Sequence, residues 1–390
     1  MKYSIKIVDE MIVKKICFVV ASPYSALSFL KDHIKTLSAK YDVYLVANQE
    51  IKEVINALDI KDFKCIHIER NINLKLDLKA VLDLYRYFKE EKFDAVHSVT
   101  PKAGLITSLA AYWAKIPHRI HIFTGQVWAT RHGFMRYLLK WIDRIIVKLD
   151  NHILVDGEGQ RQFLIRNRIV SEENSVVLGD GSICGVNTNN FIPDKNVKNR
   201  VLKELQIPNE KVVFVFMGRL NRDKGIRELL TAYDRICENY KNTFLILFGN
   251  DEGNFQSTFT QYGNIKNQQN FLYYGLTDKP YEMLQAADVF VLPTYREGFG
   301  LSVIEASCLG IPVICSDAYG VMDAMVDNKT GLRCHVADVN TLYRCMEKLL
   351  QNSNLRLELG YNGRERVLRY FSKERLTKLW IDFYQSILNS

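Results

Sequence analysis

The sequence has no hydrophobic run long enough to cross a membrane. Its uninterrupted apolar stretches are short, such as Ile16–Ala21 and Val289–Leu292, whereas a spanning helix needs about 20 predominantly apolar residues. The N-terminus also lacks an apolar segment followed by a cleavage site, so secretion is not expected, and residues 1–10 are expected to be an extension ahead of the first strand. We therefore predict a cytoplasmic protein that can still touch a membrane surface.

Cysteine pairs and common cofactor motifs are missing as well. The eight cysteines include no Cys-x-x-Cys pair, and several lie in apolar runs, as buried thiols do in a reducing cytosol. His-Glu-x-x-His, Asp-x-Asp and the Gly-x-x-x-x-Gly-Lys-Ser/Thr loop do not occur. The nearest approach to the dinucleotide fingerprint Gly-x-Gly-x-x-Gly is Gly179–Gly185, which has one residue too many before its third glycine. Neither a metal nor a cofactor is predicted, and a dehydrogenase is disfavoured.

Acidic residues are scarce in one segment. The chain carries 52 Lys+Arg against 44 Asp+Glu, a formal net charge of +8, which is mild for a nucleic-acid binder. Residues 101–149 contain eight Lys or Arg and only Asp143, a net of +7 (8 − 1). Most of the excess charge of the chain therefore lies in this one segment.

Within this segment, cations recur every four residues between large apolar side chains. On a helix over 133–149 they would form a slanted stripe beside a wide apolar face. Such a helix suits an anionic bilayer surface or a lipid-linked diphosphate, and the alternative is a core helix with a solvated basic face. The candidate residues for acceptor or membrane binding are Lys102, Arg131, Arg136, Lys140, Arg144 and Trp128.

Short β-branched runs alternate with helical patterns along the whole chain. This alternation predicts parallel sheets with helices on both faces. Strands are expected at Ile16–Ala21, Val43–Ala47, Lys64–Ile68, Ala95–Val99, Arg119–Phe123, Ile153–Val155, Val212–Met217, Phe244–Phe248, Phe271–Tyr274, Val289–Leu292 and Val313–Cys315. Helices are expected near 25–39, 76–91, 103–115, 133–149, 224–240, 279–286, 301–309, 339–350 and 373–388.

The length of 390 residues predicts two domains, since single cores seldom exceed about 250 residues. The segment Gly179–Asn209 is rich in Gly, Asn and Pro and poor in periodicity, so we expect the hinge there. The predicted fold class is α/β, with two doubly wound, Rossmann-like domains at 1–185 and 186–372. A last helix at 373–390 is expected to pack back on the first domain. The crevice between two such domains is the expected active site.

A basic turn, Gly218-Arg-Leu-Asn-Arg-Asp-Lys-Gly225, directly follows a predicted strand and opens a helix. A glycine admits close backbone approach, and free amides at a helix start favour negative charge. Arg219 and Lys224 would add charge-assisted bonds to a diphosphate. The alternative is a solvated turn, and spacing alone does not decide between the two.

A glycine-rich turn, Glu297-Gly-Phe-Gly-Leu301, follows another predicted strand and leads into a helix carrying Glu305. Gly298 and Gly300 leave room for a ligand beside bare backbone. One carboxylate can accept the two hydroxyls of a ribose, and a second can hold a sugar. The alternative makes Glu297 a helix cap and Glu305 a surface glutamate.

His97 lies near the end of a first-domain strand, ahead of Thr100-Pro-Lys102. We expect it to face the crevice, where the following amides and Lys102 would meet a phosphate. The alternative is a core histidine, and His121 is a similar, weaker candidate. Trp128 follows the next strand and is expected to be exposed, so that it stacks on a sugar.

Together these motifs resemble glycosyltransferase family 4, a family of retaining GT-B enzymes that use nucleotide-sugar donors. Gly218-Arg219, Lys224-Gly225, Glu297-Gly-Phe-Gly, Glu305-Ala306 and Gly310-Ile-Pro-Val carry the resemblance, which extends from about residue 14 to 388. His97-Ser-Val-Thr-Pro-Lys-Ala-Gly-Leu and Gly181-Ser-Ile-Cys-Gly-Val-Asn are similar to the bacterial branch that builds capsule, O-antigen and other lipopolysaccharide or lipid-linked glycans.

The resemblance implies a role for each matching residue. Arg219 and Lys224 match the pair of cations that holds the donor diphosphate. Glu305 matches the glutamate that binds the ribose, and Glu297 matches the glutamate near the transferred sugar. The matching donor-binding backbone is Gly218, Gly275, Gly298, Phe299, Gly300 and Leu301. The implied catalytic set is Glu297, Lys224, Arg219 and His97. Ser22-Pro23 replaces the Gly-Gly pair of many members, and Thr124-Gly125 replaces their His-Gly.

The resulting hypothesis is a retaining hexosyltransferase at the inner face of the cell membrane. It would move a hexose or N-acetylhexosamine from a nucleoside-diphosphate sugar, with UDP favoured, to a polyprenyl-diphosphate-linked glycan. The alternatives are a non-hydrolysing nucleotide-sugar 2-epimerase of the same fold, which needs no acceptor, and a non-catalytic polyanion- or membrane-binding protein. No nucleic-acid partner is expected.

Overall fold

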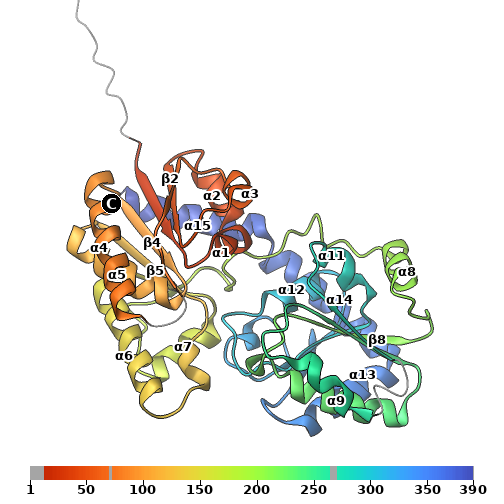
Figure 1. The fold of residues 1–390 in the computed structure, drawn as a ribbon. Helices are drawn as coiled ribbons and strands as arrows, with labels where there is room; N and C mark the ends of the chain where they lie inside the picture. Colours follow the sequence, from red (N-terminus) through yellow and green to blue (C-terminus); the bar gives the residue numbers. More distant parts are fainter. Residues whose placement is uncertain (1–12, 70–72, 264–269, 390) are drawn as a thin grey trace, which may run out of the picture. The chain divides into compact units, whose positions relative to one another are not determined.

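The computed structural model describes residues 13–69, 73–263 and 270–389 (Figure 1). The extension expected at residues 1–10 lies outside them. The chain forms two compact units. One contains the described residues up to Ile122, Ile145–Ile153 and those from Trp380 onward; the other contains Phe123–Arg144 and Leu154–Leu379. The domain limits inferred from the sequence stay a prediction.

The N-terminal half forms a seven-stranded sheet in the order β3-β2-β1-β4-β5-β6-β7. Its strands are β1 (Lys15–Val19), β2 (Asp42–Ala47), β3 (Asp62–Cys65), β4 (Ala95–Val99), β5 (His118–Phe123), β6 (His152–Val155) and β7 (Val176–Val177). The β1 pairings to β2 and β4 are parallel, as are those of β2 with β3 and of β4 with β5. The order reverses at β1, which is the doubly wound arrangement expected from the sequence.

Helices cover both faces of this sheet. The side chains of Cys17 and Val19 pack under α4 and α5, whereas Phe18 on the opposite face contacts Tyr384 of α15. This alternation follows from the two-residue period of a strand. The helices of this half are α1 (Pro23–Phe29), α2 (Lys31–Leu37), α3 (Lys52–Asn56), α4 (Leu74–Glu91), α5 (Pro101–Ala114), α6 (Gly133–Leu149) and α7 (Glu158–Arg166).

The C-terminal half forms a six-stranded sheet in the order β10-β9-β8-β11-β12-β13. Its strands are β8 (Val212–Met217), β9 (Thr243–Phe248), β10 (Phe271–Gly275), β11 (Val289–Leu292), β12 (Val313–Ser316) and β13 (Gly331–Cys334), and every neighbouring pair is parallel. The helices are α8 (Lys195–Glu204), α9 (Ile226–Asn239), α11 (Pro280–Met283), α12 (Leu301–Cys308), α13 (Val339–Gln351), α14 (Ser353–Tyr370) and α15 (Lys373–Leu388). Helices α9 and α13 cover one face, and α12 and α14 the other (Figure 1).

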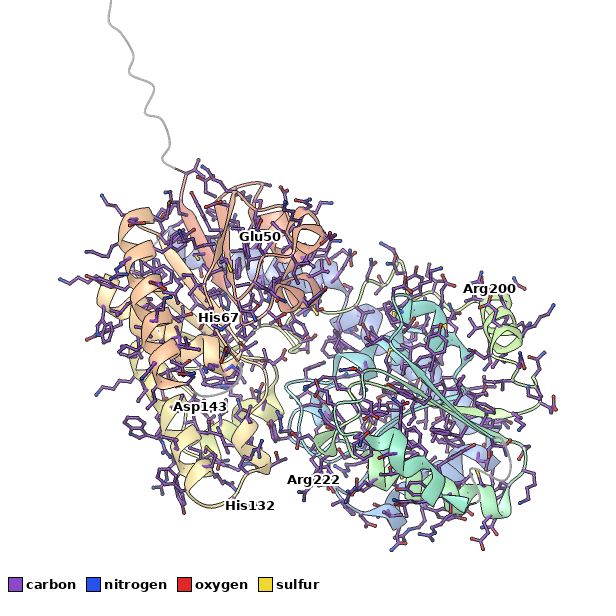
Figure 2. The ribbon with its side chains drawn as sticks, viewed as in Figure 1. Glu50, His67, His132, Asp143, Arg200 and Arg222 are labelled. Carbon is purple, nitrogen blue, oxygen red and sulfur yellow. The ribbon has the colours of Figure 1, made fainter. Side chains whose placement is uncertain are left out.

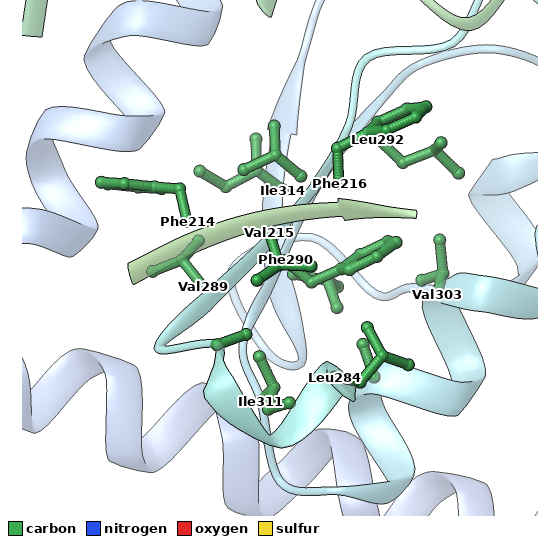
Figure 3. Close-up of a cluster of buried hydrophobic side chains, with 14 of the residues drawn as sticks. Phe214, Val215, Phe216, Leu284, Val289, Phe290, Leu292, Val303, Ile311 and Ile314 are labelled. Carbon is green, nitrogen blue, oxygen red and sulfur yellow. The ribbon is translucent and has the colours of Figure 1, made fainter. Parts of the chain in front are cut away.

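The core of this half is built on the central strands. Phe214, Val215 and Phe216 of β8 are fully buried, and they belong to one hydrophobic cluster with Phe290 of β11 and Ile314 of β12 (Figure 3). A parallel strand that is buried on both faces reads as a continuous hydrophobic run. This is why the sequence identified β8 and β11 with their observed bounds.

Several expectations need correction. The helix expected over 25–39 is interrupted at Leu30, and α1 and α2 are separate. The segment Gly179–Asn209, expected to be poor in periodicity, contains α8, which is capped by Asp194; the hinge expected in this segment stays a prediction. Strand β13 and helix α14 were not anticipated, because Gly331–Cys334 is too short and α14 too weakly amphipathic to give a clear pattern.

Candidate functional site

The two predicted donor-binding turns lie next to each other because their strands do. The basic turn follows β8, the glycine-rich turn follows β11, and β8 and β11 are paired in parallel. They flank the point where the strand order of the sheet reverses, with β9 and β10 on one side and β12 and β13 on the other. In open α/β sheets this switch point at the carboxyl ends of the strands is where ligands bind.

Two glycines allow the close approach of these turns. Gly225 ends the basic turn with φ at +70°, and a Cβ there would lie 2.0 Å from the carbonyl oxygen of Pro293. Gly249 follows β9 with φ at +133°, and a Cβ there would lie 1.8 Å from the carbonyl oxygen of Gly218. Either contact is impossible for a side chain, so glycine is required at both positions.

The structure brings Lys224 and Glu297 together. The Lys224 ammonium forms an ion pair with a carboxylate oxygen of Glu297, and both side chains are mostly buried. Arg219 lies at the same turn and is half exposed, with its guanidinium 2.8 Å from a carboxylate oxygen of Glu252. Arg222, labelled in Figure 2, is exposed. Each of the two predicted phosphate-binding cations thus has a carboxylate as its partner.

Glu305 lies on α12, one helix turn inward from the glycine-rich turn. It is partly buried beside Val303, Ile304 and Ala306. Burial raises the pKa of its carboxyl to about 7. Among the described residues its side chain has no hydrogen-bond partner, so its oxygens can accept from a ligand hydroxyl.

The backbone of the glycine-rich turn is held by a buried ring. Phe299 is buried and packs edge-on against Phe371, with ring centroids 5.2 Å apart. Gly300 has φ at +96° and precedes α12, which begins at Leu301. Gly298 lies between Glu297 and this anchor, while Gly275 ends β10 with φ at +84°. The roles of these residues in donor binding stay predictions.

His97 does not face a ligand crevice, so that expectation is wrong. The side chain is fully buried, its Nδ1 lies 2.7 Å from the Tyr384 hydroxyl, and its ring stacks on Trp380 and Phe18. Burial lowers the pKa of the imidazole well below its ordinary value. The sequence could not show this, because α15, which covers the histidine, lies 287 residues further along the chain. His97 is therefore a core histidine, which was the alternative that the sequence left open.

His121 is a core histidine as well. Its Nδ1 lies 2.8 Å from the Ser98 hydroxyl, and burial lowers its pKa to about 3. The ring packs directly over Gly104 of α5, where a Cβ would lie 2.5 Å from Cε1 of the imidazole. Lys102, on the first turn of the same helix, forms an ion pair of 2.8 Å with Asp77 of α4.

Trp128 is not exposed either, and the expectation that it stacks on a sugar is wrong. Only 1% of it is accessible, and its indole N–H donates to Asp143 at 2.7 Å. Burial raises the pKa of Asp143, labelled in Figure 2, to about 7. The lone acid of the basic segment is therefore the hydrogen-bond partner of a buried indole.

Two of the four cations of α6 are partly buried, while Arg144 and Lys148 are exposed. Arg136 and Lys140 lie over the Trp128 ring at 5.8 and 5.2 Å from its centroid, and burial lowers the pKa of Lys140. Lys140 donates to Asn167 at 3.0 Å, and Arg144 donates to the carbonyl of Arg168 at 2.9 Å. The expected stripe of cations is thus partly used in local contacts.

Aromatic side chains protrude from α6 instead. Phe134 is 78%, Tyr137 75% and Trp141 59% exposed. They recur at spacings of three and four residues, so they share one side of the helix. Arg131 and His132, just before the helix begins, are exposed too. A row of large aromatics in water is uncommon and marks an interaction surface.

Within residues 13–69, 73–263 and 270–389, no helix is long and apolar enough to span a bilayer. Across the same residues no three His, Cys, Asp or Glu side chains gather as a metal site. The prediction that the reaction needs no metal stays a prediction.

Comparisons with known proteins bear on both halves of the chain. A family model described as "Glycosyltransferase Family 4" matches residues 28–181, and one described as "Glycosyl transferases group 1" matches residues 197–366. The capsular polysaccharide biosynthesis glycosyltransferase CapM of Staphylococcus aureus is 30% identical over 366 residues, covering 93% of this chain and 95% of that protein.

The names of two further relatives state the reaction that each protein catalyses. The N,N'-diacetylbacillosaminyl-diphospho-undecaprenol alpha-1,3-N-acetylgalactosaminyltransferase of Campylobacter jejuni is 25% identical, over 92% of this chain and 94% of that one. An Escherichia coli UDP-Gal:alpha-D-GlcNAc-diphosphoundecaprenol alpha-1,3-galactosyltransferase is 24% identical, over 88% and 89%. Among solved structures, Anabaena HepE in complex with UDP aligns with a TM-score of 0.79 at 16% identity, over 95% of this chain and all of that one.

Proposed function

Because this chain belongs to glycosyltransferase family 4, with the GT-B fold and the enzymatic activity of a glycosyltransferase, we propose that it transfers a hexose or N-acetylhexosamine from a UDP-sugar to a polyprenyl-diphosphate-linked glycan, with retention of configuration. The observation that carries the proposal is the pairing of Lys224 with Glu297 beside Arg219 and Glu305, at the switch point of the C-terminal sheet. Two cations and two carboxylates there suit a diphosphate, a ribose and a sugar.

The leaving group explains why cations are needed. Breaking the anomeric bond places negative charge on the β-phosphate and positive character on the sugar ring. Lys224 and Arg219 would stabilise the growing charge on the phosphate, and one such contact is typically worth roughly 3–4 kcal/mol. Their present carboxylate partners, Glu297 and Glu252, hold them in place until the diphosphate arrives. Release of Lys224 frees Glu297 for the hydroxyls of the transferred sugar.

Glu305 is suited to the ribose. A carboxylate can accept from both vicinal hydroxyls at once, and the Glu305 carboxyl has no hydrogen-bond partner among the described residues. Its burial makes such bonds stronger than in water. The preference for UDP draws on the E. coli relative, whose name specifies UDP-Gal, and on the HepE complex with UDP.

The acceptor is proposed from the relatives. The names of the C. jejuni and E. coli proteins specify undecaprenol-diphosphate-linked sugars, and CapM is named for capsular polysaccharide biosynthesis. An enzyme of this kind would work at the inner face of the cell membrane, where its donor is available.

A single assay series tests the reaction. Purified enzyme is incubated with UDP-, GDP- and dTDP-sugars and a synthetic polyprenyl-diphosphate-linked acceptor, and the anomeric configuration of the product is read by NMR. We expect turnover with one UDP-sugar, an α-linked product from an α-linked donor, and a loss of at least about tenfold in kcat/KM for Lys224→Ala. Epimerisation of the donor without acceptor would instead identify the 2-epimerase, and a Lys224→Ala variant with normal turnover would remove the residue from the donor site.

Membrane attachment is proposed through the exposed side of α6. Phe134, Tyr137 and Trp141 are the side chains that insert, since aromatic rings favour the interfacial layer of a bilayer, and the cations around them attract anionic lipid. Helix α4 also exposes leucines, Leu78 and Leu82 among them, but its four cations are matched by four acids. The charge balance therefore favours α6.

Vesicle flotation distinguishes the two helices. Replacing Phe134, Tyr137 and Trp141 by Ser is expected to reduce binding to vesicles containing phosphatidylglycerol, whereas the matched Leu78→Ser, Leu82→Ser variant retains it. The reverse result would assign the contact to α4. Reversing the charge of Arg136, Lys140 and Arg144 is a poorer test, because Lys140 and Arg144 hold the Asn167–Arg168 turn.

A further inference from the structure

Asp223 connects the two donor-site turns. It lies within the basic turn, yet its groups bond to residues 294–296, which lead from β11 into the glycine-rich turn. Its backbone carbonyl accepts from the Tyr295 amide at 2.7 Å and from the Thr294 hydroxyl at 2.9 Å. Its carboxylate accepts from Arg296, with 2.8 Å from Nε to Oδ2 and 2.8 Å from the terminal nitrogen.

The ion pair of Asp223 and Arg296 is adjacent to that of Lys224 and Glu297. Each pair joins the basic turn to the chain that follows β11. The signs of the two pairs are reversed: the acid of the first pair and the cation of the second lie on the basic turn. All four side chains are less than one-third exposed. Charges held this close compete for partners, because pairwise attraction is strong where water is partly excluded.

The rest of the turn is fixed independently. Tyr295 donates its hydroxyl to Glu228 of α9 at 2.7 Å, and Thr294 accepts at its carbonyl from the Ser316 hydroxyl. The backbone contacts of the Asp223 carbonyl do not involve its side chain. Removal of the carboxylate alone therefore leaves the turns connected but releases the Arg296 guanidinium.

We propose that Asp223 is a positioning residue whose carboxylate holds Arg296 away from Glu297, so that Glu297 is free to receive the donor sugar when Lys224 turns to the diphosphate. This inference rests on the proposed function and deepens it. In the absence of the Asp223 carboxylate, we expect the released Arg296 guanidinium to pair with Glu297, which is the next residue in the chain and already takes part in an ion pair with the neighbouring Lys224. The sugar would then lose its carboxylate, while the nucleotide part of the donor would still bind.

The test compares binding and turnover in three variants. We expect Asp223→Asn to lower kcat/KM for the UDP-sugar by at least about tenfold while the Kd for UDP alone changes by less than about threefold. The double variant Asp223→Asn, Arg296→Met should recover part of the lost activity, because the competing guanidinium is gone. A merely structural role predicts the opposite, a double variant as impaired as the single one or more so.

The control is Glu282→Gln, which removes the partner of Arg200 in another ion pair of the same unit. The melting temperature of each variant is measured to exclude unfolding. If the wild-type enzyme neither binds nor turns over any nucleotide-sugar, the proposed function fails and the inference fails with it. If the wild-type enzyme is active but Asp223→Asn retains its kcat/KM, or the second substitution brings no recovery, the role of Asp223 alone is refuted.

Discussion

The carboxyl of Glu305 is expected to cost stability in return for donor binding. Burial raises its pKa from an ordinary 4.5 to about 7. Because the folded state binds this proton more tightly than the unfolded state, the protein is most stable with Glu305 protonated, and stability is lost as pH rises from 4.5 through 7. Glu305→Gln keeps the shape and removes the titration, so it isolates this effect.

The size of the effect follows from the same numbers. Each tenfold change in proton affinity is worth about 1.4 kcal/mol, so a pKa of about 7 in place of 4.5 costs the folded wild type roughly 3 kcal/mol at pH 8 and less than about 1 kcal/mol at pH 5. Because Glu305 is partly exposed, solvent screens its charge. The stability that Glu305→Gln gains over the wild type between pH 5 and pH 8 is therefore expected to be roughly 1–2 kcal/mol. The Glu305→Gln variant should therefore be more stable than the wild type at pH 8 and nearly equal to it at pH 5.

Urea unfolding at pH 5 and pH 8 measures the difference, with Glu365→Gln on the exposed side of α14 as the control. Binding of UDP-sugar to Glu305→Gln, followed by calorimetry, should weaken by at least about tenfold, since the ribose loses a charged acceptor. A stability difference that does not change with pH would refute the assignment of a raised pKa. A stabilised variant with normal donor affinity would refute the ribose role instead.

Two further predictions concern the first unit. Tyr384→Phe removes the hydroxyl 2.7 Å from Nδ1 of His97 and leaves a buried imidazole nitrogen without its hydrogen bond. We therefore expect the free energy of unfolding in urea to fall by about 1–3 kcal/mol, with an unchanged Kd for UDP. A weakened Kd would instead indicate that His97 contributes to the donor site. Gly104→Ala places a Cβ 2.5 Å from the His121 ring, and we expect the resulting overpacking to destabilise by about 1–3 kcal/mol. A variant with a raised melting temperature would show that the ring moves aside at little cost and that the helix propensity of alanine prevails.

The sequence alone determined the elements with strong local patterns. The buried runs of β8 and β11 and the amphipathic helix α15 have the bounds that periodicity predicts, because each depends on residues close together in the chain. The basic turn and the glycine-rich turn were recognisable for the same reason. That the two turns lie side by side was not predicted, because it depends on the pairing of β8 with β11.

Tertiary structure decided which side chains are exposed and which partners they have. His97 and Trp128 lie at strand ends, where the sequence pattern favours a ligand, but α15 covers one and Asp143 binds the other. The large aromatic side chains of α6 are exposed, whereas Lys140 and Arg144 of the same helix donate to the Asn167–Arg168 turn. Asp223 has no distinctive sequence signal, since its partner Arg296 lies 73 residues away. Burial and pairing depend on contacts between distant segments, and local periodicity carries no information about them.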